Sequence, residues 1–227
     1  MNIVYALTRN VYHYILPSMK SLAEHNPKAN VYVLAEDDSL PFDLPMDAEV
    51  INVSNQEWFP KDGVNYYNAF SYINLVKVCY PLILPVKKVI HLDADTIICD
   101  SLEKMWKTDV KGKWVAACQE KLSNWKPFGP EYYNMGVALI NCEQMRKDGI
   151  IPSMVEYLNT VKQPWADQDA WNIYGLEQDK FVEIDKRWNE CFATGYTNNP
   201  AIVHFCGIHD WWTKRNMFRR EYLEKYR

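Results

Sequence analysis

The chain changes from apolar to acidic within one short segment, Val89-Ile90-His91-Leu92-Asp93-Ala94-Asp95-Thr96-Ile97-Ile98-Cys99-Asp100. Its Val- and Ile-rich first half predicts a buried β-strand, and the preceding Lys87-Lys88 pair marks where this strand enters from solvent. Alternate side chains of an extended segment point the same way, so Asp93 and Asp95 can converge. Their hard oxygen atoms suit Mg²⁺ or Mn²⁺ shared with phosphate. Acids at the carboxyl end of a strand in an open α/β sheet therefore predict a metal–diphosphate site.

Two other interpretations fit this acidic pair. The first is a solvated acidic turn that caps the next helix. The second is the nucleophile motif of haloacid-dehalogenase-like phosphatases, which Asp93-Ala94-Asp95-Thr96-Ile97 resembles. That motif usually opens its domain and has a downstream pair of acids for magnesium. Here the segment lies in the middle of the chain and no adjacent acidic pair follows it, which disfavours the phosphatase interpretation.

Composition restricts the class of protein. With 227 residues, 48% hydrophobic and 24% charged, the chain predicts one globular domain with a substantial core. A net charge of −4 argues against a generic nucleic-acid binder. The six cysteines form no Cys-x-x-Cys, so their spacing indicates neither a zinc site nor a redox motif and favours reduced thiols in a cytoplasmic protein. The first ten residues indicate a strand rather than a secretory signal, and no apolar run is long enough to span a bilayer.

Strand-like and helix-like patterns alternate along the chain. We expect strands at 2–7, 31–35, 49–53, 89–92, 114–118, 133–141, 181–184 and 201–204, and helices at 11–25, 65–84, 101–106, 142–148, 151–159, from 166 onward and at 213–227. This order predicts an α/β fold with a mostly parallel sheet and flanking helices. No Gly-x-Gly-x-x-Gly and no Gly-rich phosphate loop occur, so any bound phosphate would depend on a metal and scattered basic groups.

Seven short motifs make the chain resemble the glycogenin-like retaining glycosyltransferases, glycosyltransferase family 8, from Ile3 to about Trp212. They are Ala6-Leu7-Thr8-Arg9-Asn10, Lys77, Leu92-Asp93-Ala94-Asp95-Thr96, Leu102 with Trp106, Asn134-Met135-Gly136-Val137, Asp167-Gln168-Asp169 and His204-Phe205-Cys206-Gly207. The resemblance implies one Rossmann-like GT-A domain over residues 1–212, followed by a basic, aromatic C-terminal helix over 213–227. It also implies a metal-dependent hexosyltransferase that takes UDP-glucose or UDP-galactose as donor. The acceptor would be a glycan, a lipid-linked sugar or a protein.

The same resemblance implies roles for individual residues. Asp93, Asp95 and His204 would bind Mn²⁺, with Mg²⁺ as the alternative. Asn134, Asp167 and Gln168 would surround the transferred sugar. Glutamine is a poor nucleophile, which favours front-face attack assisted by the departing diphosphate, with Asp167 as an alternative helper. The residues implied to bind the donor and its metal are Leu7, Thr8, Asn10, Tyr12, Lys77, Asp93, Ala94, Asp95, Gly207 and Lys214.

Each assignment has a structural alternative. A histidine at a strand end is usually a satisfied core residue. Tyr12 or Tyr14 could stack on uracil or pack on a helix face, and Lys77 could be a solvated helix lysine. Carboxylates in the first turn of a helix, here Asp167 and Asp169, are favoured there by the helix dipole alone.

One position departs from the family motif His-x-x-Gly-x-x-Lys-Pro-Trp. Asp210 stands where the lysine is expected, and Trp211 replaces the proline. A carboxylate that faces a diphosphate is unfavourable, so we expect His209, Lys214 or Arg215 to supply the missing cation, the two helix residues more effectively than the histidine. The alternative is a sugar-nucleotide-binding protein without transfer activity.

The tail after Trp211 mixes aromatic and basic residues. It predicts either a helix packed on the domain or a peripheral contact with the inner face of the membrane.

Overall fold

The computed structural model describes residues 1–37, 43–67, 71–121, 131–207 and 218–227. Within these ranges a seven-stranded sheet runs in the order β3-β2-β1-β4-β7-β6-β8. Its strands are β1 (Asn2–Leu7), β2 (Asn30–Ala35), β3 (Ala48–Asn52), β4 (Val89–Leu92), β6 (Val115–Gln119), β7 (Tyr133–Ile140) and β8 (Phe181–Glu183). Strand β7 is antiparallel to both of its neighbours, and the other pairs are parallel. The predicted mostly parallel α/β sheet is confirmed.

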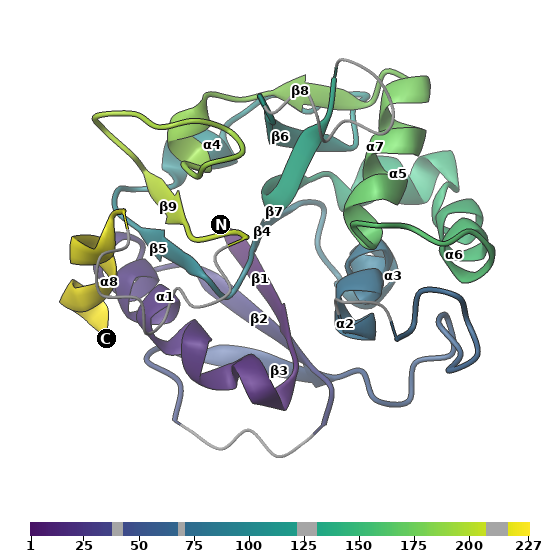
Figure 1. Cartoon of the computed structure of the whole chain (residues 1–227), viewed down its shortest axis with the longest axis horizontal. Helices are drawn as coiled ribbons and strands as arrows, with labels where there is room; N and C mark the ends of the chain where they lie inside the picture. Colours follow the sequence, from purple (N-terminus) through teal and green to yellow (C-terminus); the bar gives the residue numbers. More distant parts are fainter. Residues whose placement is uncertain (38–42, 68–70, 122–130, 208–217) are drawn as a thin grey trace.

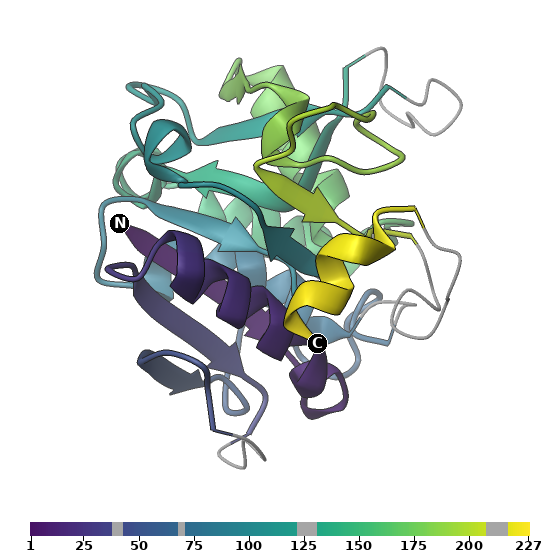
Figure 2. The same ribbon diagram turned by 90° about the vertical axis from the view of Figure 1, so that its left-hand side faces the viewer.

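Helices cover both faces of this sheet (Figure 1). They are α1 (Tyr12–His25), α2 (Tyr72–Leu75), α3 (Tyr80–Ile83), α4 (Glu103–Trp106), α5 (Cys142–Asp148), α6 (Ile151–Thr160), α7 (Asp167–Glu177) and α8 (Arg220–Tyr226). Side chains of β1 alternate between the two faces, as the pleat of a strand requires. Ile3 and Tyr5 pack with Ile15 and Met19 of α1, whereas Val4 packs in the core under α2, α3 and α5 to α7. Figure 2 shows α1 lying along its face of the sheet.

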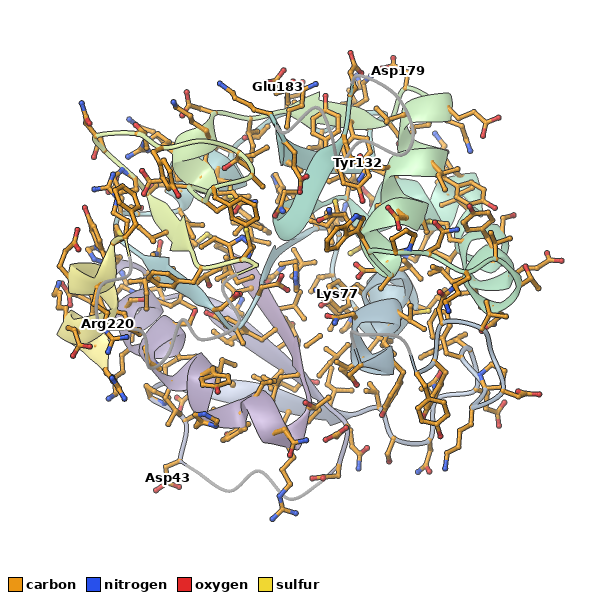
Figure 3. The ribbon with its side chains drawn as sticks, viewed as in Figure 1. Asp43, Lys77, Tyr132, Asp179, Glu183 and Arg220 are labelled. Carbon is orange, nitrogen blue, oxygen red and sulfur yellow. The ribbon has the colours of Figure 1, made fainter. Side chains whose placement is uncertain are left out.

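The long helix expected over 65–84 is wrong, because the structure divides this segment. Tyr72–Leu75 is helical, Val76–Cys79 is a 3₁₀ turn, and α3 then begins at Tyr80. Pro81 explains the interruption, since proline lacks an N–H group and clashes with the carbonyl four residues earlier. The 3₁₀ turn has a functional consequence: it turns Lys77 into the interior, where Figure 3 shows it beside the strands.

A second, two-stranded sheet was not expected. Strand β5 (Thr96–Ile98) follows the acidic pair directly and is antiparallel to β9 (Ile202–His204), with Thr96 opposite His204. Such a short strand has no periodicity of its own and is defined by a partner far away in the sequence. This pairing places His204, which lies late in the sequence, beside Asp93 and Asp95.

The C-terminal helix packs on the domain. Leu223 and Tyr226 of α8 are buried in a cluster with Phe205, and Lys225 Nζ lies 2.6 Å from Glu24 Oε1 on α1. These contacts bury Leu223 and Tyr226 against the domain and support the packed-helix alternative. Residues 213–217 of the expected helix lie outside the described ranges. Among the described residues, no helix has the length and apolarity needed to cross a bilayer.

Candidate active site

Three strand ends meet at one edge of the sheet. Strands β1 and β4 are parallel, so Leu7 and Asp93 leave them at the same edge. Strand β7 runs the other way, and the Asp93 N–H donates to the carbonyl of Gly136 at 2.8 Å. The carboxyl ends of the parallel strands and the amino end of β7 therefore enclose one site, where an open α/β sheet binds ligands.

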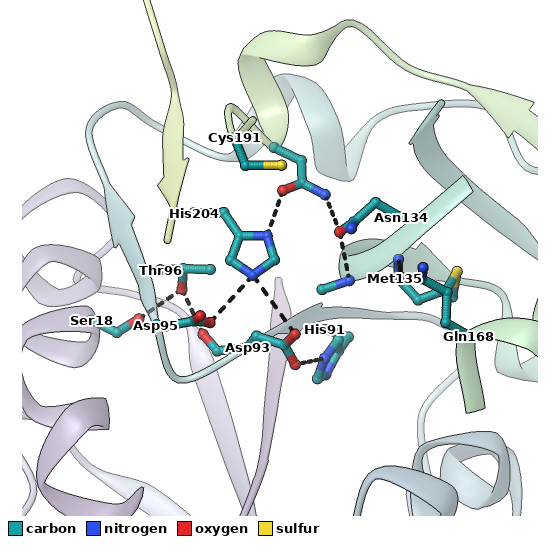
Figure 4. A network of polar contacts seen from close by, with 12 residues as sticks. Ser18, His91, Asp93, Asp95, Thr96, Asn134, Met135, Gln168, Cys191 and His204 are labelled. Carbon is teal, nitrogen blue, oxygen red and sulfur yellow. Dashed lines mark hydrogen bonds and ion pairs between the residues drawn. The ribbon is translucent and has the colours of Figure 1, made fainter. Parts of the chain in front are cut away.

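Two carboxylates and an imidazole converge there (Figure 4). His204 Nε2 lies 3.2 Å from Asp95 Oδ1 and 3.8 Å from Asp93 Oδ2. One ligand atom from each of the three residues lies within 4.8 Å of the others. Burial lowers the pKa of His204, but Asp95 beside it raises that pKa well above its usual value. The position thus favours positive charge, and its oxygen and nitrogen ligands fit Mn²⁺ or Mg²⁺.

The two oxygens of Asp93 have different surroundings. Oδ1 lies 2.7 Å from Lys77 Nζ and 2.9 Å from His91 Nε2, whereas Oδ2 is the oxygen nearest His204. Burial alone would raise the pKa of Asp93, but Lys77 and His91 hold it well below its usual range. The carboxylate stays ionised, with Oδ1 held by the protein and Oδ2 directed toward the candidate metal position.

His91 is a neutral positioning group for Asp93. Burial and nearby Lys77 lower the pKa of His91 to about 4. In the neutral ring, Nδ1 can accept the hydrogen bond from Tyr80 OH at 3.0 Å while Nε2–H donates to Asp93. Two hydrogen bonds thereby orient the ring, and the ring in turn fixes one oxygen of a metal-ligand candidate.

Gly136 leaves room for the cluster. A Cβ at this position would lie 2.2 Å from His204 Cε1 and 2.7 Å from Asp93 Oδ2. Both distances are far below van der Waals contact, so a side chain here would displace two of the three candidate ligands. The glycine inside a predicted strand marks close approach of functional side chains to the backbone.

A chain of side-chain hydrogen bonds connects His204 to the residues predicted around the sugar. His204 Nδ1 donates to Asn189 Oδ1 at 2.8 Å, and Asn189 Nδ2 donates to Asn134 Oδ1 at 2.8 Å. Asn134 Nδ2 then donates to Glu120 Oε1 at 2.8 Å, which also accepts from Gln168 Nε2 at 3.3 Å. In the neutral ring that a metal requires, a proton on Nδ1 directed to Asn189 leaves the lone pair of Nε2 facing the aspartates.

Gln168 and Asp169 have different surroundings within α7. Gln168 Oε1 accepts from the Met135 N–H at 2.9 Å, so both polar atoms of this amide are held in the network. Asp169 accepts hydrogen bonds from Tyr132 OH at 2.6 Å and from the Trp165 N–H at 2.8 Å. Both oxygens of Asp169 are thus held by hydrogen bonds within the protein.

Asp167 is a buried carboxyl with one unsatisfied oxygen. Its side chain is 5% exposed, and Oδ2 has no hydrogen-bond partner among the described residues. Burial raises its pKa to about 7; nearby Lys77 opposes this and Asp93 adds to it. The preceding Ala166 has φ 54°, a strained value for a residue with a Cβ. Strain and an unpaired buried oxygen at one helix start are typical of functional sites.

This raised pKa predicts a pH-dependent stability. The folded state keeps the Asp167 proton up to about pH 7, while the unfolded chain loses it near pH 3.9, so this group's contribution to stability is lost as pH rises between these values. Asp167→Asn has no ionisable carboxyl group at this position, so it does not lose this stability as pH rises. We expect its free energy of unfolding, relative to the unmodified chain, to improve by about 2–3 kcal/mol between pH 4.5 and pH 7.5. Urea unfolding at both pH values measures this difference, and a constant difference would show that Asp167 ionises normally.

The other predicted donor residues lie at the same edge or nearby. Leu7 is buried, Thr8 is half-buried and Asn10 is exposed. Tyr12 is fully buried in a cluster with Leu7, as its packing alternative expects, whereas Tyr14 is half-buried. Ala94 is half-buried beside the acids, and Gly207 follows β9 with φ 70°. His209, Asp210, Lys214 and Arg215 lie outside the described ranges.

Residues 2–215 match the model of glycosyl transferase family 8. The chain belongs to this family. General stress protein A of Bacillus subtilis is 26% identical to it over 83% of this chain and 74% of that protein. A putative glycosyltransferase of Haemophilus influenzae is 23% identical over 95% of this chain and 74% of that protein. Membership confirms the family predicted from the seven motifs.

Solved structures confirm the GT-A fold. An active-site mutant of LgtC, in which glutamine is replaced by glutamate, superposes with a TM-score of 0.77 at 22% identity, over 100% of this chain and 95% of that chain. The galactosyltransferase LgtC in complex with donor and acceptor sugar analogues gives 0.73 at 23% identity. The bifunctional glycosyltransferase WbbM gives 0.79 at 14% identity over 49% of its chain.

Sequence reasoning overlooked several side chains of this family 8 site. They are Tyr80, His91, Glu120 and Asn189. His91 carried a signal, because a histidine inside a buried strand two residues before an acid points to the same side as that acid. Asn189 carried none, since it approaches His204 only through the fold.

Proposed function

We propose that this family 8 chain is a metal-dependent hexosyltransferase that transfers a sugar from a UDP-sugar, UDP-glucose or UDP-galactose, with retention of anomeric configuration. The acceptor would be a glycan, a lipid-linked sugar or a protein. The observation that carries the proposal is the convergence of Asp93, Asp95 and His204 at the open edge of the sheet. The complex of LgtC with donor and acceptor sugar analogues supports a sugar-nucleotide donor for a fold of this shape. Six free thiols support a cytoplasmic setting.

Asp93, Asp95 and His204 would hold the Mn²⁺ or Mg²⁺ ion. When bound, such an ion supplies Lewis-acid stabilisation of the negative charge that develops on the departing diphosphate. Lys77 and His91 keep Asp93 ionised and fixed in direction. Asn189 keeps the proton of His204 on the nitrogen that faces away from the aspartates. These residues pre-organise the ligands, so little reorganisation is needed when the donor binds.

Asn134 and Gln168 would position the transferred sugar. Their amides are tied together through Glu120, and the amide of Gln168 is a poor nucleophile. A retaining glycosidase would instead place a carboxylate nucleophile at the sugar. The arrangement therefore favours attack of the acceptor on the face that the diphosphate leaves. The acceptor proton would pass to the leaving diphosphate, and Asp167, with a pKa of about 7, is suited to assist as a base.

A ligand screen tests this function. We expect UDP-glucose or UDP-galactose to raise the thermal stability of the chain when Mn²⁺ is present and to do so far less with a chelator. At 100 times its dissociation constant, a ligand adds about 2.7 kcal/mol of stability. Equal shifts with metal and with chelator would contradict the metal-dependent site.

A turnover assay separates transfer from binding alone. Release of UDP in the presence of Mn²⁺ and candidate acceptors supports the transferase. Metal-dependent binding without UDP release across glycan, lipid-linked and protein acceptors would favour the alternative, a sugar-nucleotide-binding protein of the same fold. That alternative rests on Asp210, which stands where the family motif has a lysine.

A further inference from the structure

Two cysteines lie beside His204. The sulfur atoms of Cys191 and Cys206 and one ring nitrogen of His204 lie within 4.8 Å of one another. Figure 4 shows Cys191 on the Nδ1 side of the imidazole, whereas Asp93 and Asp95 lie on the Nε2 side. The same histidine therefore borders two groups of metal-ligating atoms with different chemistry, one of carboxylate oxygens and one of sulfurs.

The backbone holds this second group together. The His204 N–H donates to the carbonyl of Glu190 at 2.9 Å, and the Glu190 N–H donates to the carbonyl of Ile202 at 2.9 Å. These bonds fix the segment that carries Cys191 beside the strand that carries His204. Cys191 and His204 are 3% and 4% exposed, while Cys206 is half-buried and gives access from solvent. The two sulfur atoms and the ring nitrogen thus lie close together before any ion is bound.

The spacing suits a tetrahedral metal. With Zn–S bonds of about 2.3 Å and a Zn–N bond of about 2.0 Å, ligand atoms in a tetrahedral zinc site lie about 3.5–3.8 Å apart. Atoms within 4.8 Å reach that spacing through small side-chain adjustments. Sulfur and imidazole ligands select Zn²⁺ over Mn²⁺ or Mg²⁺. We propose that Cys191, Cys206 and His204 form a second metal site for Zn²⁺ or a similar soft ion, with the fourth position left to water.

Binding at this site would interfere with the aspartate site through His204. Each thiol loses a proton to solvent when its sulfur binds the ion. Zinc at Nδ1 replaces the proton that this nitrogen donates to Asn189, and the neutral ring then carries its proton on Nε2. A protonated Nε2 cannot ligate a metal between Asp93 and Asp95. The two sites therefore exclude each other, so Zn²⁺ acts as an inhibitor; this consequence rests on the proposed function, whereas zinc binding itself does not.

Cadmium binding tests the site independently of any activity. The full-length chain, freed of metal and reduced with a phosphine, is titrated with Cd²⁺, whose bonds to sulfur give an ultraviolet charge-transfer band. We expect a band that saturates at one ion per chain. Cys191→Ser and Cys206→Ser should each weaken binding at least about 100-fold, the upper end of what loss of an outer-shell partner produces. The matched control is Cys99→Ser, which removes a half-buried thiol outside the cluster and should leave the titration unchanged.

Alkylation of the unmodified chain guards against variants that fail to fold. Zn²⁺ should slow the alkylation of half-buried Cys206 by iodoacetamide, as mass spectrometry of its peptide would show, and should leave the alkylation of Cys99 unchanged. Three results would overturn the proposal. They are the absence of a cadmium band in the unmodified chain, bands in both serine variants equal to that of the unmodified chain, and alkylation of Cys206 at the same rate with and without Zn²⁺.

Competition tests the link to His204. Zn²⁺ should raise the dissociation constant of UDP in the presence of Mn²⁺ at least about tenfold in the unmodified chain. In Cys206→Ser, the ratio of the dissociation constants with and without Zn²⁺ should fall toward one. A chain that shows the cadmium band but binds no UDP refutes the proposed function and keeps the zinc site. A chain that binds UDP with Mn²⁺ but shows no cadmium band refutes the zinc site alone. A zinc effect of equal size in Cys206→Ser would refute the exclusion between the two sites.

Discussion

Replacement of Asp95 by asparagine is expected to lower the rate of sugar transfer about 100- to 1000-fold, or about 2.7–4 kcal/mol of transition-state stabilisation. Asp95 Oδ1 lies 3.2 Å from His204 Nε2, and its side chain is 26% exposed at the end of a strand rather than packed in the core. The substitution removes one negative charge from the candidate metal ligands and retains the shape of the side chain. The fold should therefore persist, with a circular dichroism spectrum and an unfolding transition close to those of the unmodified chain.

Asp100→Asn is the matched control for this experiment. Asp100 belongs to the same acidic segment, but its carboxylate pairs with Arg187 at 2.8 Å and is 52% exposed. The same change of charge there should leave the transfer rate within about twofold, because Asp100 pairs with Arg187 and with none of the candidate metal ligands. Loss of this exposed ion pair should cost only about 0–1 kcal/mol of folding stability. If Asp95→Asn transfers sugar as fast as this control, Asp95 is not a ligand of a catalytic metal.

The substitution Gly136→Ala is expected to abolish the stabilisation of the protein by UDP with Mn²⁺. The added methyl group would meet His204 Cε1 at 2.2 Å and Asp93 Oδ2 at 2.7 Å, so both side chains must move away from the candidate metal position. We expect a transfer rate at least about 100-fold lower and a stability loss of about 1–3 kcal/mol from overpacking. Thermal shifts with and without UDP and Mn²⁺, together with the transfer rate, measure both effects.

Gly112→Ala separates the effect on the site from a general cost of replacing glycine. Gly112 has φ 74°, and a Cβ there would meet no atom within 4 Å. Alanine in this left-handed conformation costs about 1–2 kcal/mol of stability but disturbs no candidate ligand. The control should therefore keep its metal-dependent response to UDP. An unchanged response in Gly136→Ala as well would mean that His204 and Asp93 do not hold the metal together.

Local patterns predicted most elements of the fold because local physics determines them. Ile15, Met19 and Leu22 recur at helical spacing and are all buried in α1, and the Val- and Ile-rich segment before Asp93 forms the central strand β4. The helix expected over 65–84 was wrong because apolar spacing was weighed without the backbone restriction of Pro81. Strand β5 was missed because three residues carry no periodicity and its partner is β9, about a hundred residues later.

The residues of the candidate site likewise fall into those that the sequence could predict and those that it could not. Asp93 and Asp95 were predictable from alternation along an extended segment, and His204 only from its place in a family motif. The surroundings that tune them were not predictable. Lys77 was expected near the donor phosphate, and the structure places its Nζ 2.7 Å from Asp93 Oδ1; the link from His204 through Asn189 to Asn134 is made by three segments far apart in the sequence. Sequence spacing likewise indicated no zinc site, because Cys191 and Cys206 approach each other only in the folded chain.

Calorimetric titration of UDP into the chain, with Mn²⁺ and then with a chelator, tests the central claim most directly, because it asks whether a metal held by Asp93, Asp95 and His204 binds the donor's diphosphate. We expect saturable binding of one UDP per chain with Mn²⁺, at least about 100-fold weaker binding with the chelator, and a comparable loss in Asp95→Asn even with Mn²⁺. Binding of equal affinity in all three titrations would contradict the account.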